Sequence, residues 1–202
     1  MSVEALESSL DQLLGAVFGS ELGRTRLDAT CADYDARVGT IFEDDHAAGM
    51  LRLLRADWGL CEERDAEGLR WIDRCAFGEV DGVDVDDALR LGQTIAGAFE
   101  VWPGREVWLR DRLRGLCVRL VDPIEVGGDG SEAAALWDAR VWLTPAGARL
   151  CRIPLVYPDG ALEHLRAKQR GRRPGAPWPS LPVLRRAFVR WYRARGRQPF
   201  EL

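Results

Sequence analysis

Hydrophobic residues in the first half of the chain recur at helical spacing. Leu6, Leu10, Leu13, Leu14 and Val17 fall on one face of residues 3–18, which predicts an amphipathic helix that ends at Gly19. Shorter or weaker versions of this pattern predict further helices at residues 24–38, 47–58, 66–76 and from Asp84 or Asp86 to Gly97. We therefore expect residues 1–96 to form an acidic helical region.

The pattern changes between Gly97 and Pro158, where short apolar runs alternate with glycine and proline turn signals. Residues 136–143 alternate, with Trp137, Ala139 and Val141 on one face and Asp138 and Arg140 on the other, which is typical of a half-buried strand. Five runs of this kind are predicted as strands, at residues 98–102, 106–111, 116–121, 135–143 and 148–157. Their regular spacing predicts a small antiparallel β-barrel or meander over residues 97–158.

Two helices are predicted in the last segment, residues 159–202. The first begins at an Asp159 cap and runs to about Gln169, and a Pro/Gly-rich linker near residues 171–179 separates it from the second. The second helix, capped by Ser180, separates an apolar face (Leu184, Phe188, Trp191 and Tyr192) from an arginine face (Arg186, Arg190, Arg193 and Arg197). The expected fold class is therefore α+β, with a helical N-terminal half, a small β module and basic C-terminal helices.

The net charge of −4 conceals an uneven distribution. Residues 161–199 contain eleven bases and a single acid, Glu163, and so carry a formal charge of +10. With Glu201, this leaves −13 on residues 1–160. A basic segment on an acidic chain indicates electrostatic partners, and it agrees with either nucleic acid or a protein that has an acidic surface.

Composition and the N-terminus bear on the compartment. The N-terminus carries acids where a secretory signal carries bases, and no apolar run approaches the 18 residues of a membrane span. The five cysteines are odd in number and contain no CxxC pair, which favours reduced thiols over a disulfide or zinc framework. We expect a cytoplasmic protein without a membrane segment.

The sequence offers little for catalysis. It contains two histidines, His46 and His164, and neither forms a local Cys-His or Ser-His-Asp signature. Phosphate-binding loops of the GxxxxGK[ST] type and a GxGxxG motif after a strand are also missing. The acids at residues 43–45 are a weaker candidate for a metal site than for a helix N-terminal cap, because adjacent side chains at a helix start diverge. We expect no catalytic residues, cofactor or metal.

The strongest candidates for partner binding are aromatic and arginine side chains. Trp108 and Trp142 fall on strand faces that also carry charged residues, so they are candidates to stack on bases or to anchor a protein interface, with burial inside a small barrel as the alternative. Together with the arginine face of the last helix, they lead us to expect a non-catalytic interaction or scaffold subunit of a bacterial multi-protein assembly. The alternative is a nucleic-acid-binding protein that uses the basic C-terminal segment.

Two resemblances bear on these expectations. Residues 141–147, VWLTPAG, resemble the junction between wing and helix in winged-helix repressors, which implies a helix after Pro145 in place of a strand. On a wider scale, Ile41–Asp45, Asp57-Trp58, Phe99–Val101 with Pro103-Gly104 and Leu109–Asp111 resemble the corresponding segments of a group of bacterial proteins without an assigned activity. Because that group has no assigned activity or catalytic residues, the second resemblance implies nothing about function. Barrel and winged helix both stay open for residues 97–158.

Overall fold

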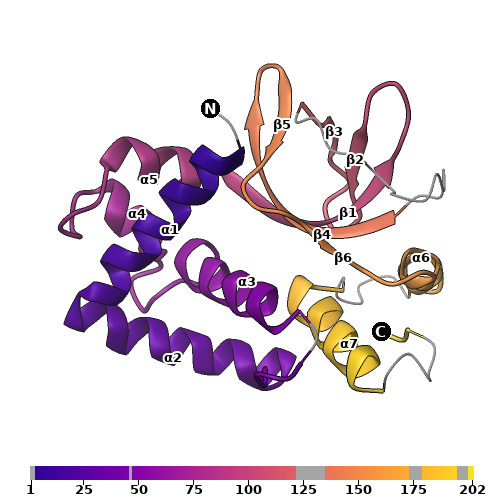
Figure 1. Cartoon of the computed structure of the whole chain (residues 1–202), viewed down its shortest axis with the longest axis horizontal. Coiled ribbons are helices and arrows are strands. Elements are labelled where there is room, and N and C mark those ends of the chain that lie inside the picture. Colours follow the sequence, from indigo (N-terminus) through magenta and orange to yellow (C-terminus); the bar gives the residue numbers. More distant parts are fainter. Residues whose placement is uncertain (1–2, 46, 122–134, 173–178, 195–199) are drawn as a thin grey trace. The chain divides into compact units, whose positions relative to one another are not determined.

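The computed structural model of the chain describes residues 3–45, 47–121, 135–172, 179–194 and 200–202. It comprises helices and one curled antiparallel sheet, which confirms the predicted α+β class (Figure 1). The chain divides into two compact units, Met1–Thr94 and Ile95–Leu202. Each unit is described by itself below.

The first unit is helical. It contains α1 (Val3–Gly19), α2 (Glu21–Val38), α3 (Ala48–Cys61), α4 (Trp71–Ala76) and α5 (Val85–Gly92). The predicted apolar stripe of α1 is buried, and Leu10 and Val17 are fully enclosed. Ser20 accepts a hydrogen bond from the Gly23 amide at the start of α2, and Asp84 caps α5 through the Asp87 amide. Three of the predicted helices need correction at their boundaries.

The first two corrections concern α3 and α4. Residue Ala47 precedes α3 without a side-chain cap, and Asp45 instead closes a turn by accepting from the Phe42 amide, so the predicted acidic cap is wrong. The predicted helix at residues 66–76 is helical only from Trp71. Asp65 binds the amides of Glu67 and Leu69, at 2.9 and 3.1 Å, and holds that segment in a turn.

The third correction concerns α5. The helix predicted to reach Gly97 ends at Gly92, because the chain from Thr94 onward pairs in the sheet. β1 (Thr94–Trp102) is buried over nearly its whole length, and strand pairing there overrides the helical spacing of the apolar residues.

The sheet of the second unit has the order β3-β2-β1-β4-β5, with β6 paired to β4. Its further strands are β2 (Trp108–Asp111), β3 (Cys117–Arg119), β4 (Ala135–Thr144), β5 (Gly147–Leu150) and β6 (Leu155–Val156). A parallel bridge joins Leu120 to Ala148, and the Val121 amide donates to the Ala148 carbonyl at 2.8 Å. The β3 edge is therefore drawn onto the β5 edge, and the sheet curls into a half-barrel (Figure 1).

Four of the five predicted strands are confirmed in this sheet, whereas the fifth, predicted at residues 148–157, is divided into β5 and β6, with residues 151–154 outside any strand. The winged-helix alternative is wrong. Residues 141–150 form an antiparallel hairpin with Thr144 opposite Gly147, so the segment after Pro145 is a strand and not a helix. Gly147 has φ +135°, and a Cβ atom there would lie 2.5 Å from the carbonyl oxygen of Arg119. Only glycine fits where the hairpin approaches β3 this closely.

Two helices complete the second unit, α6 (Ala161–Arg170) and α7 (Leu181–Arg193). The residue before α6 is Gly160, with φ +82°, and no side chain caps the helix, so the Asp159 cap was predicted wrongly. α7 packs its predicted apolar face inward. Leu184 and Phe188 are buried, and the Phe188 ring meets Tyr157 edge-on at 5.5 Å.

Candidate interaction surface

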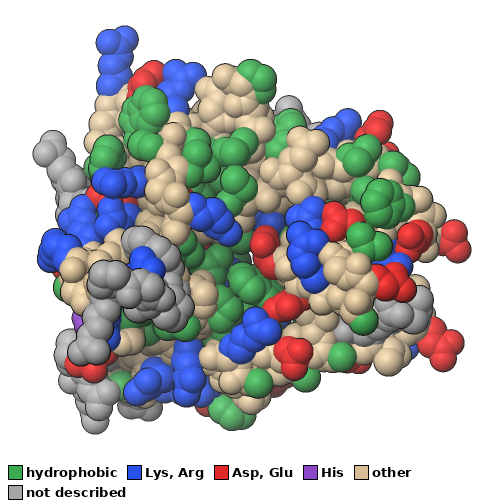
Figure 2. Space-filling view, turned by 180° about the vertical axis from the view of Figure 1, so that it is seen from behind, with side chains coloured by type: hydrophobic (Ala, Val, Ile, Leu, Met, Phe, Trp, Pro, Cys, Tyr) green, Lys and Arg blue, Asp and Glu red, His purple; other side chains and the backbone are tan. Residues whose placement is uncertain are grey.

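The arginine face of α7 is exposed where it is described. Arg186, Arg190 and Arg193 are all exposed, whereas Arg197 lies outside the described residues. The side chains of Arg186 and Arg190 have no hydrogen bond or ion pair with any residue that the structure describes. Figure 2 shows Lys and Arg side chains on the surface of the second unit. These two guanidinium groups are available to an anionic partner.

Arg185, next to this face, has a different role that the sequence analysis missed. Its side chain is 2% exposed and binds Asp138 of β4 twice, with Nε to Oδ2 at 2.6 Å and Nη2 to Oδ1 at 2.9 Å. Asp138 was expected on an open strand face, but β4 is buried on both faces. The sequence did indicate that Arg185 is buried, because it falls on the apolar stripe of α7 beside Leu181 and Leu184.

Two tryptophans lie side by side at the end of the β1–β2 hairpin. Trp102 is directly opposite Trp108 in the register, and the side chains are 41% and 40% exposed. Directly opposite residues on neighbouring strands have Cβ atoms about 4.5–5.5 Å apart, so the two exposed side chains leave the same face of the sheet at neighbouring positions. We call Trp102 and Trp108 the tryptophan surface.

The two predicted tryptophans are not neighbours in the sheet. Trp142 is half-buried on β4 opposite Arg149, and β1 lies between β4 and β2. The partner of Trp108 is Trp102, which the sequence analysis did not select. The signal was present in the five residues between them, because Pro103-Gly104 marks a hairpin turn that sets its two flanking tryptophans opposite each other.

A buried carboxylate holds Trp102 in place. Glu100 has a side chain 2% exposed, and it accepts hydrogen bonds from Trp102 Nε1 and from Arg166 of α6. Arg112 Nη1 adds a longer contact at 3.3 Å. Burial alone would raise the pKa of Glu100, but the hydrogen bonds from Trp102 and Arg166 and the charge of Arg112 outweigh it and hold that pKa below its usual value. Trp102 is thereby preorganised while its ring is exposed.

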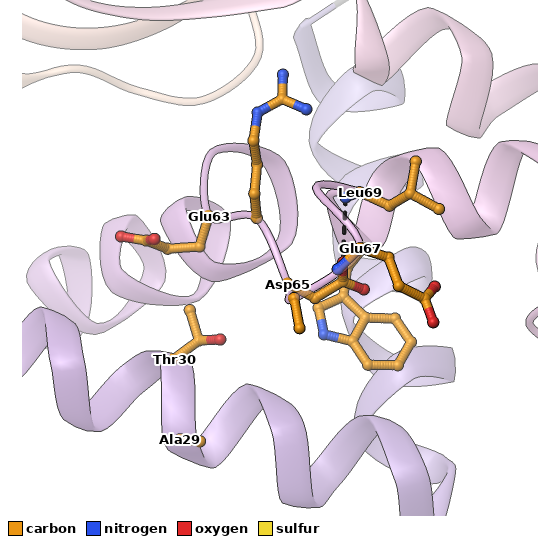
Figure 3. Close-up of a pocket in the computed structure, with 9 residues that line it drawn as sticks. Ala29, Thr30, Glu63, Asp65, Glu67 and Leu69 are labelled. Atoms are coloured by element: carbon orange, nitrogen blue, oxygen red, sulfur yellow. Dashed lines mark hydrogen bonds between the residues drawn. The ribbon is translucent and has the colours of Figure 1, made fainter.

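The first unit has a pocket of about 320 Å³ lined in part by Glu63, Asp65 and Glu67 (Figure 3). Figure 3 shows Glu63 and Glu67 pointing away from each other. Arg74 binds Asp65 at 2.6 Å and Glu67 at 2.5 Å, and the hydrogen bond from Arg74 lowers the pKa of Asp65. Glu63 accepts from Trp58 Nε1 at 2.8 Å. The three carboxylates therefore fasten the loop before α4.

The histidines and the acidic side chains were the residues to check for a catalytic or metal site. His164 Nε2 accepts from the Leu202 amide at 3.1 Å, which is a structural contact near the C-terminus, and His46 lies outside the described residues. Within the described ranges, no group of three His, Cys, Asp or Glu side chains is arranged to hold a metal ion. Nor does any helix there combine the length and the apolar composition needed to span a membrane.

Comparisons with known proteins add no relative to this description. No family model matches the sequence, and neither the search of curated proteins nor the search of solved structures gave a match.

Proposed function

We propose that the chain is a non-catalytic interaction subunit of a bacterial multi-protein assembly, and that the tryptophan surface is its main contact with a protein partner. The observation that carries this proposal is the exposure of Trp102 and Trp108 side by side on neighbouring strands. Tryptophan and arginine are the residue types most enriched among interface residues that dominate binding energy.

The chemistry of the surface supports a preformed anchor. Each large aromatic ring left in water forgoes about 25 cal/mol per Å² of apolar area, a free energy that a partner recovers by covering it. Glu100 fixes Trp102 before binding, so little side-chain entropy is lost when the partner docks. The exposed Arg186 and Arg190 favour a partner whose surface is acidic, because charge complementarity accelerates and orients association.

Nucleic-acid binding is the second candidate, and one observation favours it. Arg110 follows Trp108 at two residues' distance on β2, so an exposed aromatic ring and an exposed cation share one strand face. Single-stranded nucleic acid is bound by this combination, with bases stacked on rings and phosphates held by arginine. The basic C-terminal segment would add affinity that falls steeply with salt.

Affinity purification from the native cell separates the two candidates. The variant Trp102→Ala/Trp108→Ala removes the surface, and Phe77→Ala is the matched control, because Phe77 is 67% exposed in the first unit. We expect wild type and the control to retain a protein partner through nuclease treatment, and the double variant, still folded by circular dichroism, to lose it. Release of the partner by nuclease, or its retention by the folded double variant, would contradict the proposal.

A further inference from the structure

The second unit, which contains the sheet, has a pocket at the turn between β2 and β3. It has a volume of about 250 Å³ and is lined by residues 110–115 and by Gln169 of α6. Gln169 Nε2 donates to the Arg112 carbonyl at 2.5 Å and its Oε1 accepts from Arg112 Nη2, so α6 is fastened to the turn. The pocket is therefore built from two elements that are far apart in sequence.

The lining is strongly basic. Three arginines, Arg110, Arg112 and Arg114, face a single acid, Asp111, which gives a formal charge of +2. The Asp111 side chain is fully buried and already occupied, since Oδ1 accepts from the Leu113 amide and Oδ2 from Arg114 Nη1. Its negative charge is directed at Arg114, so it does not neutralise Arg110 or Arg112, and the acid nearest to Arg112 is Glu100, at 3.3 Å.

The hydrogen-bonding capacity of these two arginines is only partly used. Arg110 is exposed, and its side chain has neither a hydrogen bond nor an ion pair among the described residues. Arg112 uses Nη1 and Nη2, but its buried Nε has no hydrogen-bond partner there. The unsatisfied buried Nε leaves the charge of Arg112 only partly compensated within the protein.

The positive charges of Arg110, Arg112 and Arg166 lie close together beside the pocket. Burial lowers the pKa of Arg112, Glu100 opposes that effect, and the charges of Arg110 and Arg166 lower the pKa further. Glu100 is shared among Trp102, Arg112 and Arg166, so one carboxylate cannot neutralise the cluster. The fold keeps cations together that would otherwise repel one another.

We propose that this pocket binds a phosphate-type oxyanion, held by the guanidinium groups of Arg110 and Arg112 with Arg114 at the rim. The planar forks of arginine match the oxygens of phosphate and can bind them in pairs. A dianion balances the formal charge of +2 in the lining, whereas a single carboxylate leaves half of it. The volume accommodates a phosphate with a small organic substituent. This inference does not depend on the tryptophan surface or on its proposed partner.

The test is calorimetric titration of the purified full chain at constant ionic strength with two probes, inorganic phosphate and phenyl phosphate. The test variant is Arg110→Gln, chosen because Arg110 supports no other described residue. Arg105→Gln is the matched control, since Arg105 is exposed in the β1–β2 turn outside the pocket. We expect wild type and the control to bind alike, and Arg110→Gln to bind about tenfold more weakly or worse.

The two probes identify the source of the phosphate group. Tighter binding of phenyl phosphate indicates a phosphate ester, and equal binding indicates free phosphate; either result supports the proposal. An equal loss of affinity in Arg105→Gln would indicate general surface electrostatics and would overturn it. So would unchanged binding by Arg110→Gln, no heat of binding at millimolar phosphate, or binding of a single-stranded oligonucleotide without binding of either small probe.

Discussion

The buried pair of Arg185 and Asp138 gives the sharpest test of the sheet unit. The two side chains are 2% and 0% exposed and are joined by two hydrogen bonds. Replacing Arg185 by Met removes one charge and leaves the Asp138 carboxylate buried without its bidentate partner. Breaking a buried ion pair in this way costs about 3–5 kcal/mol. Because folded proteins are stable by only about 5–15 kcal/mol, the variant should lose a large part of its stability.

The assay is unfolding in urea, monitored by circular dichroism. With a denaturant dependence of about 2 kcal/mol per M, the expected loss shifts the midpoint down by roughly 2 M. The matched control is Arg186→Gln, one residue along the same helix but exposed, where a change under about 0.5 kcal/mol is expected. The double variant Arg185→Met/Asp138→Ala should be more stable than Arg185→Met, because it removes the stranded charge. Similar midpoints for Arg185→Met and Arg186→Gln would refute this reasoning.

Two further predictions concern ionisable groups. The pKa of Glu100 is lowered in the folded state, so its ionised form stabilises the sheet unit above the unfolded-state pKa of about 4.3, and that stability is lost as the pH falls through the lower folded value. Glu100→Gln should therefore show a flatter fall in melting temperature below about pH 5 than wild type, and parallel curves would contradict this. Cys117 is exposed, whereas Cys31, Cys61, Cys75 and Cys151 are buried, and burial raises the pKa of Cys75 to about 11. A thiol reagent should therefore rapidly modify Cys117 alone in the wild-type protein, and no cysteine in the variant Cys117→Ser. A second rapidly modified thiol in the native protein would show that the buried cysteines are accessible.

The periodicity of hydrophobic residues identified the elements in which one face is buried along the whole length. The stripe of α1 and the two faces of α7 were predictable because burial on one side of a helix repeats every three or four residues. The strands were predictable from their turns. The end of α5 was not, because apolar spacing around Ile95 fits both a helix and a strand, and pairing across the sheet decides between them.

The candidate sites depend on contacts between distant segments, which one sequence does not reveal. Arg185 and Arg186 are adjacent and chemically identical, yet one binds Asp138 in the core and the other is exposed. The phosphate pocket requires Gln169 to reach the turn that contains Arg112, 57 residues earlier. The Trp102–Trp108 pair is different, because the turn between the two residues fixes their register and the sequence contained the necessary signal.

The proposed role of the tryptophan surface is tested most directly by crosslinking in the native cell. A photoreactive p-benzoylphenylalanine is introduced at Trp108, which is 40% exposed, and as the control at Phe77 of the first unit, which is 67% exposed. The account predicts a discrete protein adduct at position 108 that survives nuclease and is weaker or missing at position 77. No adduct at position 108 above the level at position 77, or an adduct that nuclease removes, would contradict it.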